Sequence, residues 1–197
     1  MEHYYTQDPQ TPHDIRTIVF SAGDIRLELI TDAGVFSRNK VDYGSEWLIR
    51  SLPKLSGNIL DLGCGYGVIG LSIALSNSDA RVTMADVNRR AVDLASQNIE
   101  KNRIKNAVAL VSDGFRQIDG RFHAIVTNPP IRAGKHVIYP LFEQSIDYLL
   151  PGGSLYLVIQ KKQGANSAAD KLQSVFGNCE TVNKQGGYRI LKSTKPD

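Results

Sequence analysis

Short apolar runs alternate with amphipathic stretches along most of this chain. Continuous apolar runs are typical of strands that are buried on both faces, whereas apolar residues spaced three or four positions apart indicate helices. The regular alternation of the two patterns predicts a parallel sheet with helices on both faces. We expect strands at 58–62, 81–85, 108–111, 122–127 and 154–159, and helices at 46–52, 68–76, 89–102, 139–150 and 166–176.

Two further pairs of short strands stand outside this alternation. Runs at 179–182 and 188–191 flank Gln185-Gly-Gly187, and runs at 17–20 and 25–30 flank Ser21-Ala-Gly-Asp24. Short glycine-containing turns of this kind predict hairpins. The expected fold is therefore α/β, Rossmann-like and doubly wound, with a seven-stranded, mostly parallel sheet, a C-terminal antiparallel hairpin and an N-terminal β-hairpin extension. We expect an arm and hairpin over 1–45 and one compact domain over 46–197.

The apolar stripe of the predicted helix 89–102 contains one polar position. Ala91, Leu94, Ala95 and Ile99 share a face with Asn98. Asp86 or Asn88, just before this helix, is suited to cap its first turn.

Composition narrows the class of protein without naming a function. The 197 residues are 42% hydrophobic and 22% charged, which is ordinary for a globular domain, and the net charge of +3 permits an anionic partner without requiring one. Cys64 and Cys179 are too few for a disulfide framework or a zinc site, so we expect no metal. The polar start is unlike a signal peptide, and no apolar run approaches the roughly 18 residues of a membrane span. We expect a cytoplasmic protein with no membrane association.

A glycine-rich segment follows the first of the alternating strands. An apolar run ends at Asp61, and glycines recur at Gly63, Gly65, Gly67 and Gly70 before apolar residues resume. A strand, a glycine turn and a helix start in this order favour a ligand at the helix N-terminus. An ordinary tight turn is the alternative, and Gly65-x-Gly67-x-x-Gly70 also matches the dinucleotide fingerprint.

Three acids close successive predicted strands. Asp61 precedes the glycines, where its carboxylate would repel a pyrophosphate. Asp86 is suited to accept hydrogen bonds from a ribose diol, and Asp113, followed by Gly114-Phe115, to hold an adenine edge. Helix capping is the alternative role for Asp86 and Asp113. Together, the three acids favour a ligand that carries a cation and no phosphate.

The tetrapeptide Thr127-Asn-Pro-Pro130 ends another strand abruptly. Proline cannot donate to a sheet ladder, so the segment could be a strand terminator only. The Asn128 side-chain oxygen and the Pro129 carbonyl are also suited to accept hydrogen bonds from an amino group whose lone pair is delocalised. Orienting that nitrogen toward a methyl donor would be catalysis by position and electrostatics. An amide has no useful pKa, so Asn128 is not a general base.

The segment Asp61-Leu-Gly-Cys-Gly-Tyr-Gly67, with Asp86 and Asp113, resembles the cofactor motifs of class I S-adenosylmethionine-dependent methyltransferases. Their fold has an antiparallel seventh strand, which the expected terminal hairpin fits. The resemblance implies S-adenosyl-L-methionine as the cofactor, with Asp61 and the glycines toward its methionine part, Asp86 at the ribose and Asp113 at the adenine. The implied cofactor-binding residues are Phe36, Ser37, Asp61, Gly63, Cys64, Gly65, Gly67, Asp86, Val87, Asp113, Gly114 and Asn128.

Asn128-Pro129-Pro130 resembles the catalytic motif of methyltransferases that act on adenine N6, guanine N2 or a protein glutamine. Most of these enzymes carry an aromatic residue next, which stacks on a flipped base. This chain has Ile131 instead, which leaves Phe36, Phe115 and Tyr139 as candidate substitutes.

The wider resemblance is to bacterial small-subunit ribosomal RNA guanine-N2 methyltransferases of the RsmC type. It rests on Gly34-Val-Phe-Ser37, Asp42 and Gly44-Ser45 ahead of the glycine loop, and it runs from about residue 15 to the C-terminus. It implies that Phe36 and Ser37 cover the cofactor or the target base. Basic residues at the same predicted sheet edge favour an RNA substrate. The implied substrate-binding residues are Ile131, Arg132, Lys135, His136 and Lys161.

The expected function is thus methyl transfer to guanine N2 in 16S ribosomal RNA, with ribosomal RNA or the small ribosomal subunit as partner. Methylation of protein glutamine or adenine N6 stays open, as do a nicotinamide-dependent oxidoreductase and a non-catalytic RNA-binding assembly factor. Longer members of the resembled family have two methyltransferase-like halves and this chain has one. Target recognition is then expected from the arm, from dimerisation or from the RNA fold, in a monomer or homodimer.

Overall fold

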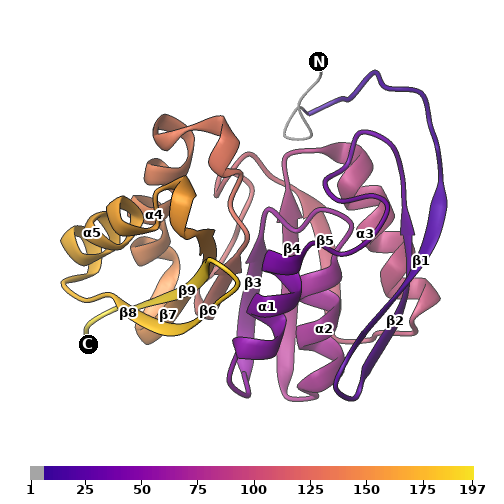
Figure 1. Cartoon of the computed structure of the whole chain (residues 1–197). Coiled ribbons are helices and arrows are strands. Elements are labelled where there is room, and N and C mark those ends of the chain that lie inside the picture. Colours follow the sequence, from indigo (N-terminus) through magenta and orange to yellow (C-terminus); the bar gives the residue numbers. More distant parts are fainter. Residues whose placement is uncertain (1–6) are drawn as a thin grey trace.

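The computed structural model describes residues 7–197 and assembles seven strands into one sheet (Figure 1). The strands are β3 (Gly57–Leu62), β4 (Ala80–Asp86), β5 (Ala107–Val111), β6 (Phe122–Thr127), β7 (Leu149–Gln160), β8 (Glu180–Gln185) and β9 (Tyr188–Thr194). Their order is β5-β4-β3-β6-β7-β9-β8, with parallel pairs from β5 through β7 and antiparallel pairs of β9 with β7 and β8. The order reverses between β3 and β6, which is where such sheets bind ligands.

Helices cover both faces of this sheet. Figure 1 shows α4 (Lys135–Tyr148) and α5 (Ala165–Phe176) on one side, and α1 (Tyr43–Ser51), α2 (Val68–Ser76) and α3 (Arg89–Lys101) on the other. Neighbouring residues of one strand pack into different hydrophobic clusters. Ile59 belongs to the cluster under α1 to α3, and Leu60 belongs to the cluster under α4 and α5. Burial on both faces is the reason why the strands are continuously apolar.

The N-terminal hairpin consists of β1 (Arg16–Ala22) and β2 (Ile25–Thr31), which form a separate antiparallel sheet. Its buried residues Phe20, Leu27 and Leu29 belong to the same hydrophobic cluster as the inner sides of α2 and α3. Asn98 of α3 also pairs with the backbone of Ile30 in both directions, at 2.7 and 3.0 Å. The hairpin is therefore packed onto the helical layer.

The predicted arm ahead of this hairpin is described only from Gln7 onward, because residues 1–6 lie outside the described residues. Arg90 of α3 holds that part by donating to the carbonyls of Pro9 and Thr11. The division into 1–45 and 46–197 stays a prediction, and its boundary lies inside α1.

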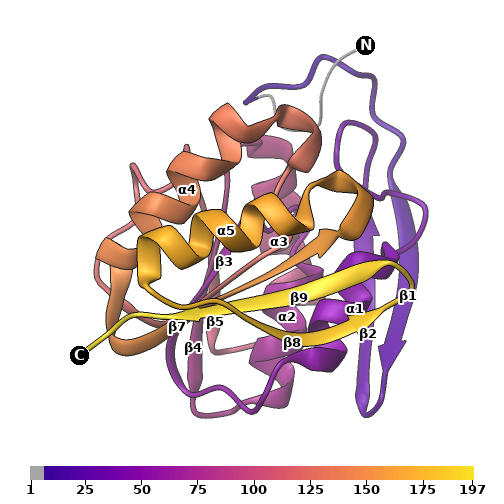
Figure 2. The ribbon, with the colours of Figure 1, turned by 60° about the vertical axis from the view of Figure 1, so that its left-hand side comes forward.

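The predicted fold class is confirmed, including the reversed terminal hairpin (Figure 2). The predicted helix 139–150 is wrong at both ends, because α4 begins at Lys135 and ends at Tyr148. Pro140 is the sixth residue of α4, beyond the first turn, where its missing N–H prevents the usual helical hydrogen bond to the His136 carbonyl. Leu149 pairs with Phe122 instead and starts β7, and the register shifts between Phe122 and Ala124.

Candidate functional site

A cavity of about 320 Å³ opens at the carboxyl edge of the sheet, where β3, β4, β5 and β6 end. The ends of these four strands and the segments that follow them form its lining, together with Phe36, the start of α1, and Val137 and Leu141 of α4. The lining includes three carboxyl groups, from Asp42, Asp86 and Asp113, and no Lys, Arg or His among the residues that the structure describes. The cavity is therefore suited to a cationic ligand and unsuited to a phosphate.

The glycine loop after β3 forms one wall of this cavity. Gly67 is the N-cap of α2 with φ +96°, a left-handed conformation that favours glycine. A Cβ at Gly70 would lie 2.5 Å from Met84 of β4, so only glycine lets α2 approach the sheet this closely. The loop thereby directs the N-terminus of α2 toward the cavity, a position that offers free backbone N–H groups.

Asp61 lies beneath the loop and is completely buried. Its Oδ2 accepts the Gly70 N–H at 2.8 Å, and its Oδ1 has no hydrogen-bond partner among the described residues. Burial raises the pKa of the Asp61 carboxyl to about 7, because desolvation outweighs the hydrogen bond from Gly70, and the negative charge of Asp86 adds to the rise. Asp61 thus has an unsatisfied acceptor directly behind the ligand loop.

Asp86 ends β4 and lines the cavity. Its Oδ2 accepts the Gly65 N–H at 2.8 Å and its Oδ1 accepts the Asn88 N–H at 2.9 Å. Burial raises the pKa of this carboxyl, against the lowering effect of backbone hydrogen bonds from Asn88, Gly65 and Val87. Because a carboxylate has about four acceptor sites, these three N–H groups leave part of its acceptor capacity for a ligand. Asn88, not Asp86, caps α3, since its side chain accepts the Ala91 N–H.

Asp113 stands at the open end of the cavity, after β5. Its side chain is exposed and forms an ion pair with Arg116 at 2.8 Å. The neighbouring Ser112 is buried, and its Oγ donates to the Gly114 carbonyl at 2.8 Å and accepts the Gln117 N–H at 3.2 Å. These bonds fix the turn that carries Asp113 and Gly114 to the cavity wall.

Asn128 follows β6 on the opposite wall. Its Nδ2 donates to Ser45 Oγ at 2.9 Å and to Asp42 Oδ1 at 3.3 Å. The orientation of the amide follows from this pairing, because an ionised carboxylate only accepts and must therefore face the NH₂ group. The remaining polar atom, Oδ1, is left as an acceptor at the cavity wall.

The two neighbours of Asn128 are also held. Thr127 Oγ1 donates to the Leu62 carbonyl at 2.7 Å, which ties the end of β6 to the end of β3. The Pro129 carbonyl accepts the Ile131 N–H at 2.8 Å and retains one lone pair. The segment is therefore rigid at the position where a reacting group would meet it.

The structure brings most of the predicted site residues together, though not all. Asp61 and Gly67 lie behind the lining, and Ser37 lies outside it, where its carbonyl accepts the Tyr66 hydroxyl at 3.4 Å. The predicted substrate-binding residues Ile131, Arg132, Lys135, His136 and Lys161 lie beyond the cavity, in η1 (Ile131–Ala133), α4 and η2 (Lys161–Gln163). The predicted residues that line the cavity are Phe36, Gly63, Cys64, Gly65, Asp86, Val87, Asp113, Gly114, Asn128, Pro129 and Pro130.

The three aromatic candidates for the residue missing after Pro130 differ in position. Phe115 is buried and stacks on Tyr148 at 4.5 Å between ring centroids, so it is excluded. The Tyr139 hydroxyl donates to the Ser167 carbonyl at 3.1 Å, within the interface of α4 with α5. Phe36 is 39% exposed and lines the cavity. Phe36 is therefore the candidate that the geometry favours.

Sequence reasoning missed the roles of Asp42 and Ser45. Asp42 caps α1 by accepting the Ser45 N–H at 3.1 Å, and the same Oδ1 accepts from Asn128. The Asp-x-x-Ser spacing signals a helix start, but nothing in it shows that this start meets the segment after β6, which is distant in the chain.

Neither a membrane helix nor a metal cluster is found within residues 7–197. No helix in this part of the chain is long and apolar enough to cross a bilayer. The same residues contain no group of three or more His, Cys, Asp or Glu side chains placed to hold a metal ion.

The sheet order, the reversed last strand and the acid-lined cavity beside Asn128-Pro129-Pro130 define a Rossmann-like methyltransferase domain. The methyltransferase small domain family matches residues 26–192, and the chain belongs to this family. The resemblance to class I methyltransferases of the RsmC type is thereby confirmed.

Three relatives place the chain within this family. It is 46% identical to the protein YbxB of Bacillus subtilis, described as uncharacterized, over 98% of both chains. It is 39% identical to ribosomal RNA small subunit methyltransferase C of Aeromonas hydrophila over 70% of this chain and 41% of that protein. The structure of the 16S rRNA N2 methyltransferase RsmC of T. thermophilus, in complex with AdoMet and guanosine, matches with a TM-score of 0.84 and 29% identity. That match covers 95% of this chain and 52% of the other, so the chain spans about half of these two relatives or less.

Proposed function

We propose that this protein transfers a methyl group from S-adenosylmethionine to guanine N2 in small-subunit ribosomal RNA, in the cytoplasm. The observation that carries the proposal is the orientation of Asn128. Its NH₂ group is engaged by Ser45 and Asp42, which leaves its Oδ1 as a fixed acceptor beside the cavity. A fixed acceptor is what an amino group with a delocalised lone pair requires for orientation.

S-adenosylmethionine fits the residues of the cavity. Its sulfonium and ammonium groups are cations and it carries no phosphate, which suits a lining with three aspartates and no basic residue. Asp86 would hold the ribose hydroxyls through its remaining acceptor capacity, and Asp113 the adenine amino group. The unpartnered Asp61 Oδ1 behind the glycine loop would balance the positive methionine end. When bound, the cofactor supplies an electrophilic methyl group.

The role of the protein in the transfer is orientation. Asn128 Oδ1 and the Pro129 carbonyl accept hydrogen bonds from the two hydrogens of the substrate amino group. The nitrogen lone pair is then oriented toward the methyl group of the donor. These acceptors also stabilise the positive charge that develops on the nitrogen. Asn128 is an amide without a useful pKa, so it does not act as a general base. The proton leaves to water after transfer.

The charge around the cavity mouth supports an RNA substrate. Arg132, Lys135 and His136 are exposed just after the Asn-Pro-Pro segment, and Lys161 follows β7. Phosphate contacts from such residues position a nucleic acid without reading its sequence. The names of the two relatives specify ribosomal RNA of the small subunit and, for the T. thermophilus enzyme, N2.

The test is transfer of radiolabelled methyl groups to unmodified 30S particles and to naked 16S RNA, followed by nucleoside analysis. We expect N2-methylguanosine as the labelled product. Asn128→Ala should lower turnover by at least about a hundredfold, which is typical for loss of one oriented transition-state contact, with cofactor affinity nearly intact. Ser45→Ala should lower turnover by about tenfold, because the amide loses one of its two anchors while the Asp42 cap of α1 remains.

Asn58→Ala is the matched control, because Asn58 is exposed at the start of β3 and its hydrogen bond to His123 uses the backbone N–H. Labelled N6-methyladenosine, or label in protein glutamine with none in RNA, would overturn the choice of acceptor. Full turnover in Asn128→Ala would overturn the catalytic assignment, and binding of RNA without any transfer would favour an assembly factor.

A further inference from the structure

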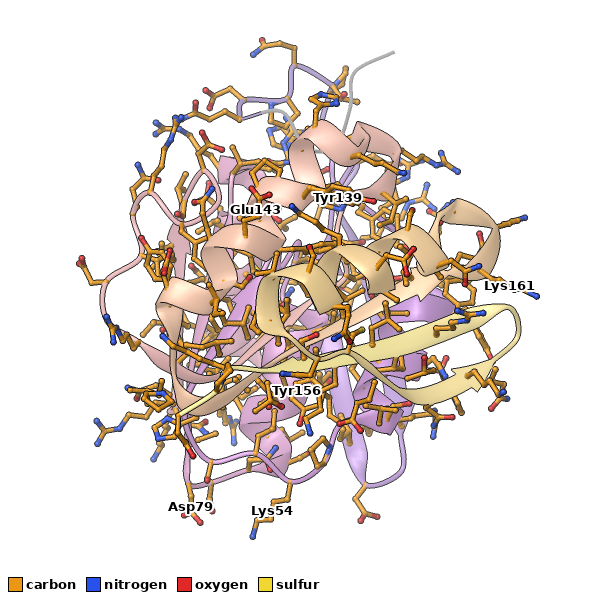
Figure 3. All side chains as sticks on the ribbon, turned by 90° about the vertical axis from the view of Figure 1, so that its left-hand side faces the viewer. Lys54, Asp79, Tyr139, Glu143, Tyr156 and Lys161 are labelled. Carbon is orange, nitrogen blue, oxygen red and sulfur yellow. The ribbon has the colours of Figure 1, made fainter. Side chains whose placement is uncertain are left out.

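A second surface adjoins the cavity on the side of α1. We call it the basic corner and define it as Tyr43, Lys161, Lys162, Lys184 and the turn Gly186–Gly187. The Gly187 carbonyl accepts the Lys161 N–H at 2.7 Å, which joins the turn between β8 and β9 to the end of β7. Figure 3 shows Lys161 beside this turn, at a distance from Lys54. The corner is therefore one continuous surface built from three separate parts of the chain.

The corner is positively charged and contains no acid of its own. Residues 160–169 and 181–196 include no Asp or Glu, although the net charge of the whole chain is only +3. Lys161, Lys162 and Lys184 are exposed, and none of them forms an ion pair with a residue that the structure describes. On α1, Glu46 is already paired with Arg50. Positive charge is thus concentrated on these three lysines, while Asp42, next to Tyr43, contacts Asn128 and lines the cavity.

Tyr43 adds an ordered aromatic ring to this charge. Its ring stacks on Trp47 with centroids 6.5 Å apart and lies tilted against Tyr188 at 5.4 Å. A Cβ on Gly186 would lie 3.0 Å from the Tyr43 ring, so the turn also presses against it. The side chain nevertheless remains 42% exposed. A ring held on several sides presents its exposed surface to a ligand at low entropic cost.

The corner lies next to the catalytic segment. Tyr43 directly follows Asp42, which accepts from Asn128, and the Tyr188 ring lies 3.1 Å from the position that a Cβ on Gly44 would take. Arg132, Lys135 and His136 belong to η1 and α4, which cover the other face of the sheet. A chain that enters the cavity from the α1 side must therefore pass the corner.

We propose that the basic corner binds the single-stranded RNA segment next to the target nucleotide. One base stacks on Tyr43, while Lys161, Lys162 and Lys184 contact phosphates. Aromatic rings with neighbouring cations are the usual means of binding single-stranded nucleic acid. The inference rests on the proposed function, since it requires an RNA acceptor.

The test measures binding of a short single-stranded oligoribonucleotide by fluorescence anisotropy, with S-adenosylhomocysteine present, over a series of salt concentrations. Tyr43→Leu should weaken binding by about tenfold and Tyr43→Phe by less than about twofold, because phenylalanine keeps the stacking face. The double variant Lys161→Ala/Lys162→Ala should lower the slope of log affinity against log salt by about 1.4, or about 0.7 for each lost phosphate contact.

Lys54→Ala is the control for charge, since Lys54 is exposed and lies away from the corner (Figure 3). It should leave affinity and slope unchanged. The melting temperature and the S-adenosylhomocysteine affinity of each variant should match those of the wild type, which separates lost RNA contact from lost folding.

If all corner variants keep the wild-type RNA affinity and salt slope, while the wild type methylates RNA, the role of the corner is wrong and the proposed function stands. Equal weakening by Tyr43→Phe and Tyr43→Leu would overturn stacking, and a wild type that neither binds nor methylates RNA would overturn the proposed function itself.

Discussion

Among single residues, Asp61 has the most unusual environment. Its carboxyl is completely buried, accepts one hydrogen bond from Gly70 and leaves Oδ1 without a partner in the described part of the chain. An apolar side chain of similar size would stabilise the folded protein more than this buried carboxyl group does. The cost is understandable if Asp61 supplies negative charge behind a cationic ligand.

This environment leads to a pH dependence of stability in the absence of cofactor. The pKa of Asp61 is about 7 in the folded protein and 3.8 in the unfolded reference. Between these values the folded state holds a proton that the unfolded state has lost, so the free energy of unfolding falls as pH rises. From about pH 5 to about pH 8, we expect the ionisation of Asp61 to lower the free energy of unfolding by about 2 to 3 kcal/mol.

Urea denaturation of wild type and Asp61→Asn at several pH values checks this expectation. The variant should lack this part of the decline, so its free energy of unfolding should increase relative to that of the wild type as pH rises. Asp79→Asn, at an exposed acid, should parallel the wild type throughout. A difference between wild type and Asp61→Asn that stays constant with pH would contradict the assignment.

Site residues differ in how far the sequence predicts them. Asp86 and Asn128 could be predicted because each directly follows a recognisable strand, and strand ends in parallel sheets share one edge. The partnership of Asn128 with Asp42 and Ser45 could not, since it depends on where the start of α1 packs. Local patterns indicate which side chains are chemically capable, while tertiary packing decides how they are oriented.

Between elements, the link of the hairpin to α3 depends on two asparagines one helical turn apart. Asn98 pairs with the backbone of Ile30, and Asn102 pairs with the backbone of Glu28 at 3.0 and 2.9 Å. Residues four apart on a helix are separated by about 6 Å, close to the roughly 6.7 Å between alternate residues of a strand. The two amides therefore replace a neighbouring strand along the free edge of β2. This explains the polar position in an otherwise apolar stripe.

The two asparagines should differ in their contribution to stability. Asn98 is completely buried and also donates to the Tyr66 carbonyl at 2.9 Å, so Asn98→Ala leaves several buried backbone groups unpaired. We expect a loss of about 2 to 4 kcal/mol, against about 1 kcal/mol or less for Asn102→Ala, whose backbone partners can turn to water. Thermal denaturation of both variants measures the difference, and equal losses would contradict the role of Asn98.

Element boundaries show the same limit of prediction as the site. The helix 68–76 and the strand 122–127 match α2 and β6 residue for residue, because a glycine loop and a pair of prolines mark their ends. The start of α4 has no such marker, and the predicted helix begins at residue 139, after the true start at Lys135. The assignment of Leu149 to β7 depends on pairing with Phe122, a tertiary contact that no local pattern contains.

Across the whole molecule, charge of opposite sign is separated over a short distance. The cavity lining carries Asp42, Asp86 and Asp113 with no basic side chain among the described residues, while Arg132, Lys135, Lys161 and Lys162 are exposed around it. Such a separation suits a small cation inside and a polyanion outside. It also accounts for a modest net charge of +3 in a protein proposed to bind RNA.

This separation of charge favours S-adenosylmethionine over a nicotinamide dinucleotide, whose binding proteins have the same glycine fingerprint. S-adenosylhomocysteine keeps the ammonium, ribose and adenine groups, so at about a hundred times its dissociation constant it should stabilise the protein by about 2.7 kcal/mol. For a chain of this size that corresponds to a rise in melting temperature of about 5 to 10 °C. NADH at the same concentration should give no rise, because its pyrophosphate would meet Asp86 with no cation in the lining to offset the repulsion. Asp86→Ala should remove most of the rise with S-adenosylhomocysteine, whereas Asp79→Ala should keep it. A comparable rise with NADH would mean that the acids do not select the cofactor, and the dinucleotide interpretation of the glycine loop would then have to be restored.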